Sequence, residues 1–187
     1  MHYHGPQLVN EVARQAQIIR VDTLNMVYRA QSGHLGGPFS VAEILAVLFF
    51  HHLRIDPTRP DADERDRLLF SKGHASPALY SALAHRGFFP LERLETFREL
   101  GSQLHGHPER GALPGVEMSS GPLGHGVAVG SGVAMALRMS GTKPSSFSAP
   151  SGRASLARVY VVLGDGELNA GLIWEGAMTA RKYRLGN

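Results

Sequence analysis

The sequence predicts an α/β fold with a mainly parallel sheet, and three observations support this class. Segments with helical spacing alternate along the chain with short apolar segments typical of strands. The segment at 158–162 is rich in β-branched residues and shows no alternation, which indicates a strand buried on both faces, as in a parallel sheet. The chain has 187 residues, 43% of them hydrophobic, so it can bury one sizeable core.

The first part of the chain is expected to be helical. From residue 12 to residue 30, apolar or small residues recur in steps of three and four, which indicates one face of a helix. The loop QSGHLGGP follows, because its glycines and proline interrupt a helix. We expect a second helix to begin at Ser40, since Ser40 and Glu43 have the spacing of a capping box.

A short buried strand is expected next, at 67–71, where RLLFS precedes the loop KGH. The segment SPALYSALAHRG predicts a helix with Ser76 as its N-cap, Pro77 at its first position and Gly87 after its end. The segment LERLETFREL predicts a further helix that Gly101 closes.

The second part of the chain begins with a long loop rich in glycine and proline, at 101–126. A loop of this length inside a compact domain is usually functional or disordered. A helix with small side chains is expected from Val127, and Gly130 and Gly132 would let another element pack closely on it. We interpret the Ser/Pro/Gly-rich segment 140–153 as a mobile surface insertion.

A final helix follows the second strand, with Gly186 as its expected stop. A crossover helix normally returns the chain to another strand. Because this sequence stops after that helix, we interpret it as an incomplete domain, truncated at its C-terminus. No internal repeat is visible.

Composition disfavours several classes of protein. The formal net charge is +3 without a block of Lys or Arg, which disfavours nucleic-acid binding and is compatible with an acidic small substrate. The absence of cysteine excludes disulfides and cysteine zinc sites. The longest apolar run, at 44–50, is too short to span a bilayer, and the N-terminus lacks a signal-peptide core. We therefore expect a cytoplasmic protein with no membrane association.

Asp165 stands between Gly164 and Gly166, directly after the second strand. Asp-Gly is a favoured hairpin turn, but the residues that follow have helical spacing and no alternation. Asp165 could also be a helix N-cap. A ligand site at the carboxyl end of a parallel strand is the functional alternative. A carboxylate repels a phosphate unless a divalent cation lies between them, and Mg²⁺ prefers few protein oxygens plus phosphates. The stretch thus predicts a metal-bridged diphosphate, without the Lys of a P-loop.

Four stretches resemble, in this order, the N-terminal part of transketolase: SGHLGGP, SKGHASPALYSAL, LGSQLHGHPERGALPGVEMSSGPLGHG and VYVVLGDGELNAGLIWEGAM. GDGE after a strand is similar to the start of the thiamine diphosphate signature. The resemblance covers 8–187 apart from the insertion at 140–153. It implies a three-layer thiamine-diphosphate-binding fold, in which 1–187 is an incomplete diphosphate-binding domain. The cofactors implied are thiamine diphosphate and Mg²⁺ or Ca²⁺.

The resemblance assigns roles to matching residues. Asp165 matches the metal-binding aspartate, and Gly164 and Gly166 match the glycines that contact the diphosphate. His34 matches a histidine at the substrate channel, and His74 matches one close to the diphosphate. A single loop histidine is more often a solvated side chain, so the assignment depends on the matching motifs.

The remaining implied site residues lie in the long loop. His107 matches a histidine that contacts the donor sugar near its reacting carbon. Gly121 and Leu123, in SGPLG, match a loop beside the aminopyrimidine and thiazolium rings, although a plain Gly-Pro turn would explain the same letters. His105 and His125 match less well, and His125 stands where the family often has glutamine.

Two departures from the family pattern stand out. Ala170 occupies the position of a glutamate that joins a carboxylate network between paired cofactors at the subunit interface. The sequence also ends before the asparagine that completes the metal site, and it lacks a pyrimidine-binding domain. The resemblance therefore implies a companion C-terminal subunit that carries this domain, in a homodimer or a heterotetramer.

The implied activity is the transfer of a two-carbon ketol unit from a ketose phosphate to an aldehyde-type acceptor. One alternative is a non-catalytic partner that keeps the fold and the dimer surface, which the change at Ala170 favours. Another is a different thiamine diphosphate enzyme, such as deoxyxylulose phosphate synthase or a 2-oxoacid dehydrogenase. Binding of the cofactor with and without a companion chain separates the first alternative from the enzyme.

Overall fold

The computed structural model describes residues 5–141 and 157–187, which belong to two compact units. Unit 1 comprises Met1–Leu53 and His74–Gly106, and unit 2 comprises Arg54–Gly73 and His107–Asn187. The chain therefore passes between the units after residues 53, 73 and 106. Most of the expected insertion at 140–153 lies outside the described residues. None of the helices in the described part is both long and apolar enough to cross a membrane.

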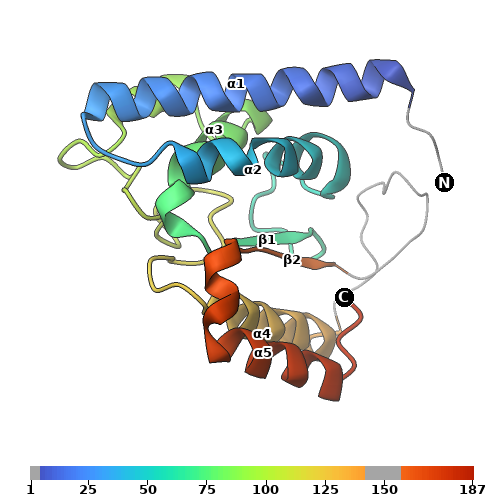
Figure 1. Cartoon of the computed structure of the whole chain (residues 1–187). Helices are drawn as coiled ribbons and strands as arrows, with labels where there is room; N and C mark the ends of the chain where they lie inside the picture. Colours follow the sequence, from blue (N-terminus) through green and yellow to red (C-terminus); the bar gives the residue numbers. More distant parts are fainter. Residues whose placement is uncertain (1–4, 142–156) are drawn as a thin grey trace. The chain divides into compact units, whose positions relative to one another are not determined.

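Unit 1 is built from three α-helices that pack against one another (Figure 1). They are α1 (Pro6–Ala30), α2 (Gly36–Val47) and α3 (Ser76–Arg86). A π-helical turn, η1 (Leu48–His52), extends α2, and a 3₁₀ turn, η3 (Leu91–Thr96), packs against α1 and α3. A second 3₁₀ turn, η2 (Gly73–Ala75), contains the junction that enters this unit.

The predicted apolar face of α1 is confirmed. Ala16, Ile19, Thr23 and Met26 are its buried residues, in steps of three and four. The helix begins earlier than the expected residue 12, with Pro6 in its first turn, where the missing N–H of proline removes no hydrogen bond.

The capping box predicted at Ser40 is wrong, because α2 already begins at Gly36. The Ser40 hydroxyl donates to the carbonyl of Gly37 at 2.9 Å, one turn back within the helix. The Glu43 carboxylate accepts instead from Arg20 of α1 at 2.6 Å. The Glu43 side chain therefore bonds to Arg20 in another helix, and not to the backbone of an N-cap residue as a capping box requires.

The start of α3 differs from the prediction in the same way. Ala75 occupies the N-cap position, and Ser76 is the first helical residue. The Ser76 hydroxyl donates to the carbonyl of Gly106 at 2.8 Å, so it does not cap the helix. Gly87 ends the helix as predicted, in a left-handed conformation with φ 94°.

The helix predicted at 91–100 is wrong in type and length. Only a 3₁₀ turn forms, and it ends at Thr96. The Thr96 hydroxyl bonds to the carbonyl of Arg93 and to the hydroxyl of Ser102, which gives the chain an alternative to helical hydrogen bonds. The long loop that follows is confirmed, because neither helix nor named strand occurs between η3 and α4.

Unit 2 contains two parallel strands, β1 (Arg67–Phe70) and β2 (Val159–Val162). Arg67 lies opposite Val159, and Phe70 lies opposite Val162. The parallel pairing and the α/β class are thus confirmed. The prediction that β2 is buried on both faces is wrong, since only Val162 is buried and the three residues before it are half-buried. Within the described residues the sheet has two strands, so β2 has one neighbouring strand, and its Val159 N–H also donates to the Asn187 carbonyl at 2.8 Å.

Helix α4 (Gly126–Met139) packs against both strands and against α5 (Gly171–Lys182), which lies beside it (Figure 1). A Cβ added at Gly130 would lie 2.6 Å from a methyl carbon of Val161, so this glycine allows the close approach that the sequence predicts. The same prediction is wrong for Gly132, where an added Cβ would meet open space.

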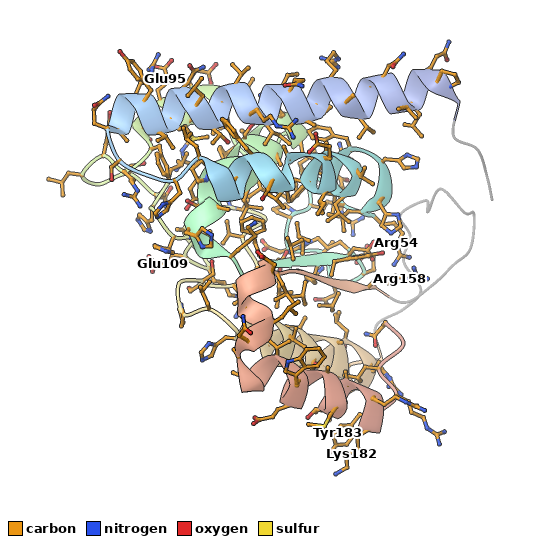
Figure 2. All side chains as sticks on the ribbon, viewed as in Figure 1. Arg54, Glu95, Glu109, Arg158, Lys182 and Tyr183 are labelled. Atoms are coloured by element: carbon orange, nitrogen blue, oxygen red, sulfur yellow. The ribbon has the colours of Figure 1, made fainter. Side chains whose placement is uncertain are left out.

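The end of α5 differs from the predicted stop at Gly186. The helix ends at Lys182, and Arg184 then adopts a left-handed conformation with φ 50°. The Lys182 ammonium lies 5.6 Å from the centre of the Tyr183 ring, at the end of the helix (Figure 2). The carbonyls of Tyr183 and Arg184 accept hydrogen bonds from Arg138 of α4, so contacts with another helix complete the end of α5 before the glycine.

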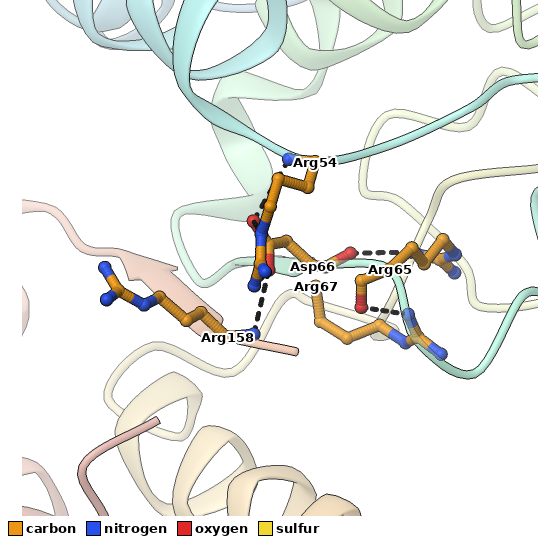
Figure 3. A network of polar contacts seen from close by, with 5 residues as sticks. All are labelled: Arg54, Arg65, Asp66, Arg67 and Arg158. Atoms are coloured by element: carbon orange, nitrogen blue, oxygen red, sulfur yellow. Dashed lines mark hydrogen bonds and ion pairs between the residues drawn. The ribbon is translucent and has the colours of Figure 1, made fainter. Parts of the chain in front are cut away.

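A buried carboxylate joins the starts of both strands (Figure 3). Asp66, which is 1% exposed, accepts from the backbone N–H of Arg54 at 3.0 Å and from that of Arg158 at 2.8 Å. Its neighbour Arg65 donates to the Asp66 carbonyl at 3.1 Å, and Arg67 donates to the Arg65 carbonyl at 2.7 Å. Burial lowers the pKa of the Arg67 guanidinium. The acceptors in this network compensate the desolvated charges.

Candidate functional site

The Gly-Asp-Gly segment lies just after the carboxyl end of β2, in unit 2. Asp165 opens a 3₁₀ turn, η4 (Asp165–Asn169), which leads into α5. The hairpin alternative is therefore wrong, since β2 pairs in parallel with β1 and a helix follows the turn. The N-cap alternative for Asp165 is also wrong, because Gly164 occupies that position. The Asp165 side chain is exposed, and no atom lies within 4 Å of a Cβ added at Gly166. This end of the strand thus offers a free carboxylate beside open backbone.

Glu167, two residues beyond Asp165, has the opposite environment. It is 2% exposed. One carboxylate oxygen, Oε1, accepts from the Ser71 hydroxyl at 2.5 Å and from the Gly124 N–H at 2.8 Å. The other, Oε2, accepts from the Gly164 N–H at 2.7 Å. The sequence patterns assigned no role to this residue, although its place three residues after Gly164 is that of a capping-box glutamate.

Ser71 extends this network from the end of β1. Its backbone N–H donates to the Val162 carbonyl at 2.9 Å, which continues the pairing of the two strands. Its hydroxyl oxygen accepts from the Gly126 N–H at 3.2 Å while donating to Glu167. The end of β1, the loop before α4 and the Gly-Asp-Gly segment are thus joined by one set of hydrogen bonds.

His107 and the SGPLG loop also come together in unit 2, and Gly124 of this loop is the residue that donates to Glu167. A Cβ added at Gly73 would lie 2.6 Å from the Ser120 hydroxyl oxygen and 3.0 Å from Cδ2 of His107. A Cβ added at Gly121 would lie 3.8 Å from the same His107 atom. The side chain of His107 is exposed, and Leu123 is 49% exposed. Three of the residues singled out from the sequence, His107, Gly121 and Leu123, are therefore on loops of one unit with accessible side chains or backbone.

The Ser120 hydroxyl is a buried polar group without a protein partner. Its oxygen has no hydrogen-bond partner among the residues that the structure describes. Buried hydroxyls are generally hydrogen-bonded, so an isolated one marks a position where a ligand or a water completes the bonding. The close approach of Gly73 leaves this hydroxyl directly beside the loop that carries His107.

His34 and His74 form a pair within unit 1. Their rings are T-shaped, with centroids 5.8 Å apart. His34 is exposed on the loop before α2, and His74 is half-buried in η2. A Cβ added at Gly37 would lie 3.2 Å from Nε2 of His74, so the imidazole packs against the first turn of α2.

Two further histidines have identifiable surroundings. The His105 carbonyl accepts from the Tyr80 hydroxyl at 2.8 Å, and burial raises the pKa of that phenol. Nδ1 of His125 lies 3.2 Å from the Leu123 carbonyl, to which it can only donate. These contacts lie within the protein, and they assign neither residue to a ligand.

Ala170 is the N-cap of α5. A Cβ added at Gly124 would lie 2.6 Å from its methyl carbon. Gly124 itself has a φ of 86°, which other residues rarely adopt. Because Gly124 has no side chain and Ala170 has only a methyl group, the loop before α4 can approach the turn after Asp165 closely.

The donor set suits a metal ion shared with a phosphate ligand. Within 5–141 and 157–187, no group of three or more His, Asp or Glu side chains could hold a metal ion by itself. Mg²⁺ usually keeps one or two protein carboxylates and fills its other positions with phosphate and water. The exposed carboxylate of Asp165, the open space at Gly166 and the unsatisfied Ser120 hydroxyl fit a diphosphate and its cation.

Residues 12–187 match the family described as transketolase, thiamine diphosphate binding domain. The chain is 40% identical over 175 residues to the 6-deoxy-6-sulfo-D-fructose transketolase subunit SqwG of Clostridium sp. (strain MSTE9), covering 94% of this chain and 59% of that protein. It is 38% identical over 179 residues to an apulose-4-phosphate transketolase subunit of Phocaeicola vulgatus, covering 96% and 59%.

A solved transketolase from Pichia stipitis superposes on this chain with a TM-score of 0.84 at 36% identity, over 95% of this chain and 26% of that one. The chain therefore spans 59% of the length of the two curated relatives and about a quarter of the Pichia protein. The family match, the identities and the shared fold agree with one another. This chain belongs to the transketolase family, as a thiamine diphosphate binding domain.

Proposed function

We propose that the chain is the N-terminal subunit or part of a transketolase-like enzyme that transfers a two-carbon ketol unit from a ketose phosphate to an aldehyde-type acceptor. Two relatives named as transketolase subunits support this, because each aligns with nearly the whole chain. Their names give different sugars, 6-deoxy-6-sulfo-D-fructose and apulose 4-phosphate. We therefore propose acidic sugars as the substrate class and name no individual donor or acceptor.

The Gly-Asp-Gly turn at the carboxyl end of β2 is the main support for this function. Ligands of open α/β sheets bind at this end of the strands. Asp165 is exposed there, and Gly166 leaves room for an anion to approach the backbone. Asp165 would share Mg²⁺, or Ca²⁺, with the diphosphate, and Gly164 and Gly166 would contact its oxygens. Thiamine diphosphate, when bound, supplies the carbon nucleophile that ketol transfer needs.

The other assigned residues act on the substrate and on the cofactor rings. His107, next to Gly121, would donate a hydrogen bond to the donor sugar near its reacting carbon. The Gly121 carbonyl and the exposed Leu123 side chain would contact the ring part of the cofactor. An imidazole ring carries an N–H donor, which suits His107 for a hydrogen bond to a sugar hydroxyl.

His34 and His74, in unit 1, complete the set of proposed site histidines. His34 would face the hydroxyls of the donor, and His74 would donate to a phosphate oxygen. Their edge-to-face contact supports a joint position, since moving one ring displaces the other. Neither role requires a permanent charge, because neutral imidazole still carries one N–H donor.

The proposed assembly includes a companion C-terminal subunit with a pyrimidine-binding domain. The word subunit in the names of the two relatives supports a division of the enzyme between chains. We propose a homodimer or a heterotetramer in the cytoplasm, without nucleic acid or membrane partners. The companion chain would supply the ring-binding side of the cofactor site.

Calorimetric titration of the chain with thiamine diphosphate and Mg²⁺, with and without the companion chain, tests the proposal. The assembled wild-type protein should bind, and Asp165→Ala should weaken the Mg²⁺-dependent affinity by at least about tenfold, or 1.4 kcal/mol. Asp61→Ala, which removes another exposed aspartate of unit 2, is the matched control and should leave the affinity unchanged. Equal affinity of Asp165→Ala and wild type would refute the assigned metal site.

A non-catalytic partner is the second candidate, and Ala170 is the observation that favours it. The glutamate absent here belongs to the carboxylate network that the resemblance implies. Failure of thiamine diphosphate to bind in either condition would select this candidate. Binding without ketol transfer from any ketose phosphate would instead favour a different thiamine diphosphate enzyme.

A further inference from the structure

We infer that Glu167 is a positioning residue, which holds the Gly-Asp-Gly segment in the conformation that receives the metal-bound diphosphate. The inference rests on the proposed function, since it concerns the same site. In this role Glu167 does not contact the ligand. It orients the backbone around Asp165, which the exposed Asp165 carboxylate cannot do itself.

The geometry of the carboxylate supports this role. Its two oxygens accept three hydrogen bonds from three separate segments, donated by the Ser71 hydroxyl and the backbone N–H groups of Gly124 and Gly164. The three donor–acceptor distances are 2.5, 2.8 and 2.7 Å, so all three donors lie within hydrogen-bonding range of the carboxylate.

Burial separates Glu167 from its neighbour Asp165. Glu167 is 2% exposed, whereas Asp165 is exposed at the surface of the same turn. A carboxylate whose oxygens already accept three protein donors has little capacity left for a metal ion. Glu167 therefore acts through Gly164, the residue that precedes Asp165, by fixing the direction of its N–H group.

The three donors explain why a neutral side chain cannot substitute. Glutamine has one oxygen, and its amide NH₂ group can only donate. In Glu167→Gln the NH₂ group must face at least one of the N–H or O–H donors, and that donor loses its acceptor. An unsatisfied buried donor is costly, so the loop before α4 or the Gly164 segment has to move.

The chain provides a built-in reporter of this movement. Trp174 is the single tryptophan, and its indole N–H donates to the Leu168 carbonyl inside η4 at 2.8 Å. Displacement of the turn that contains Glu167 would change this hydrogen bond. The fluorescence of Trp174 therefore reports on the turn, independently of any activity.

The test compares thiamine diphosphate binding by wild type, Glu167→Gln and Asp66→Asn in the assembled protein, by calorimetry at saturating Mg²⁺. Asp66 is the matched control, because it is also a buried acid of unit 2 but lies before β1, at the opposite ends of the strands. We expect Glu167→Gln to weaken the affinity at least tenfold and to shift the Trp174 emission. Asp66→Asn should lower thermal stability. It should keep the affinity for thiamine diphosphate within twofold of wild type and leave the Trp174 emission unshifted.

Each result bears on a different claim. No binding by wild type refutes the proposed function, and binding by wild type with equal affinity for Glu167→Gln refutes the positioning role alone. Equal weakening by Asp66→Asn and Glu167→Gln also refutes it, because the effect would then follow from lost stability. If Glu167→Gln does not fold, Ser71→Ala decides, since it removes one donor and keeps the carboxylate. This variant should bind three- to tenfold more weakly, and wild-type affinity would overturn the inference.

Discussion

Asp66 and Arg54 form a two-point ion pair inside unit 2. Nη2 of Arg54 lies 2.6 Å from Oδ1 of Asp66, and Nε lies 3.2 Å from Oδ2. The side chains are 4% and 1% exposed for the arginine and the aspartate. The same carboxylate accepts the N–H of Arg158 at the start of β2 (Figure 3), so it contributes to the alignment of the strands as well as to charge balance.

Asp66→Asn should lower the free energy of unfolding by about 3–5 kcal/mol, because it leaves the buried Arg54 guanidinium without its counter-charge. Urea unfolding at pH 7, followed by circular dichroism, measures the effect. The Arg59–Glu64 pair of the same unit serves as the control, since its nitrogen–oxygen distance is also 2.6 Å but its arginine side chain is 53% exposed. Glu64→Gln should change stability by about 0–1 kcal/mol. Equal effects of Asp66→Asn and Glu64→Gln on stability would contradict the conclusion that burial makes the Asp66–Arg54 pair the more important one.

Gly130→Ala should destabilise the protein, because the new methyl group would lie 2.6 Å from Cγ2 of Val161 in β2. Overpacking of this kind costs about 1–3 kcal/mol. Gly132→Ala, two residues along the same helix, meets open space and should stabilise it by about 0.5–1 kcal/mol. Thermal unfolding of both variants tests the prediction, which fails if Gly130→Ala melts at or above the wild-type temperature.

Gly37→Ala should move the imidazole of His74, since the added methyl group would lie 3.2 Å from its Nε2 atom. The imidazole resonances of His74 in a ¹H–¹³C correlation spectrum measure the displacement. Gly36→Ala is the matched control, because no atom lies within 4 Å of its added Cβ. If His74 has the proposed role toward the diphosphate, only Gly37→Ala also weakens thiamine diphosphate binding. Identical His74 shifts in both variants would argue against the packing described for α2.

The ion pair between Glu43 and Arg20 should make stability depend on pH in the acid range. The hydrogen bond from Arg20 lowers the pKa of the Glu43 carboxyl below its ordinary value of 4.5. A lowered pKa in the folded state stabilises the protein above the ordinary pKa, and this stabilisation is lost as pH falls through the folded-state pKa. Glu43→Gln should therefore cost less than about 1 kcal/mol at pH 7, since the Glu43 side chain is 59% exposed.

The difference between Glu43→Gln and wild type should disappear when both proteins are compared well below the folded-state pKa of Glu43. Chemical unfolding at several pH values measures it. A difference that stays constant down to the acid limit would show that packing, and not charge, accounts for the effect of the substitution.

The sequence was sufficient where a local pattern decides the structure. The face of α1 follows from the spacing of Ala16, Ile19, Thr23 and Met26, and each strand follows from a short apolar segment. The starts of α2 and α3 were wrong because the hydroxyls of Ser40 and Ser76 bond to carbonyls other than those of a cap. The partner of Ser76 is 30 residues away, at Gly106, so no local pattern contains it.

The same difference between local and long-range contacts applies to the residues of the candidate site. The position of Asp165 after a strand was predictable, because its neighbours and that strand are adjacent in the sequence, while its metal-binding role stays a proposal. Glu167 was missed because its donors at Gly124 and Ser71 are 43 and 96 residues away. Its capping-box spacing from Gly164 is a local signal, but that spacing does not reveal the burial of the carboxylate. Only the packing of the turn against the other loops identifies it.

The division of the chain into alternating segments has a consequence for protein synthesis. Unit 1 has all its residues once the ribosome has produced residue 106, whereas β1 must wait for β2, whose pairing partners are 92 residues further along. Until then β1 has an unpaired edge, and the loop to be closed is long, which slows folding. While β2 is still missing, β1 of a nascent chain therefore has an open strand edge, which can pair wrongly with other chains.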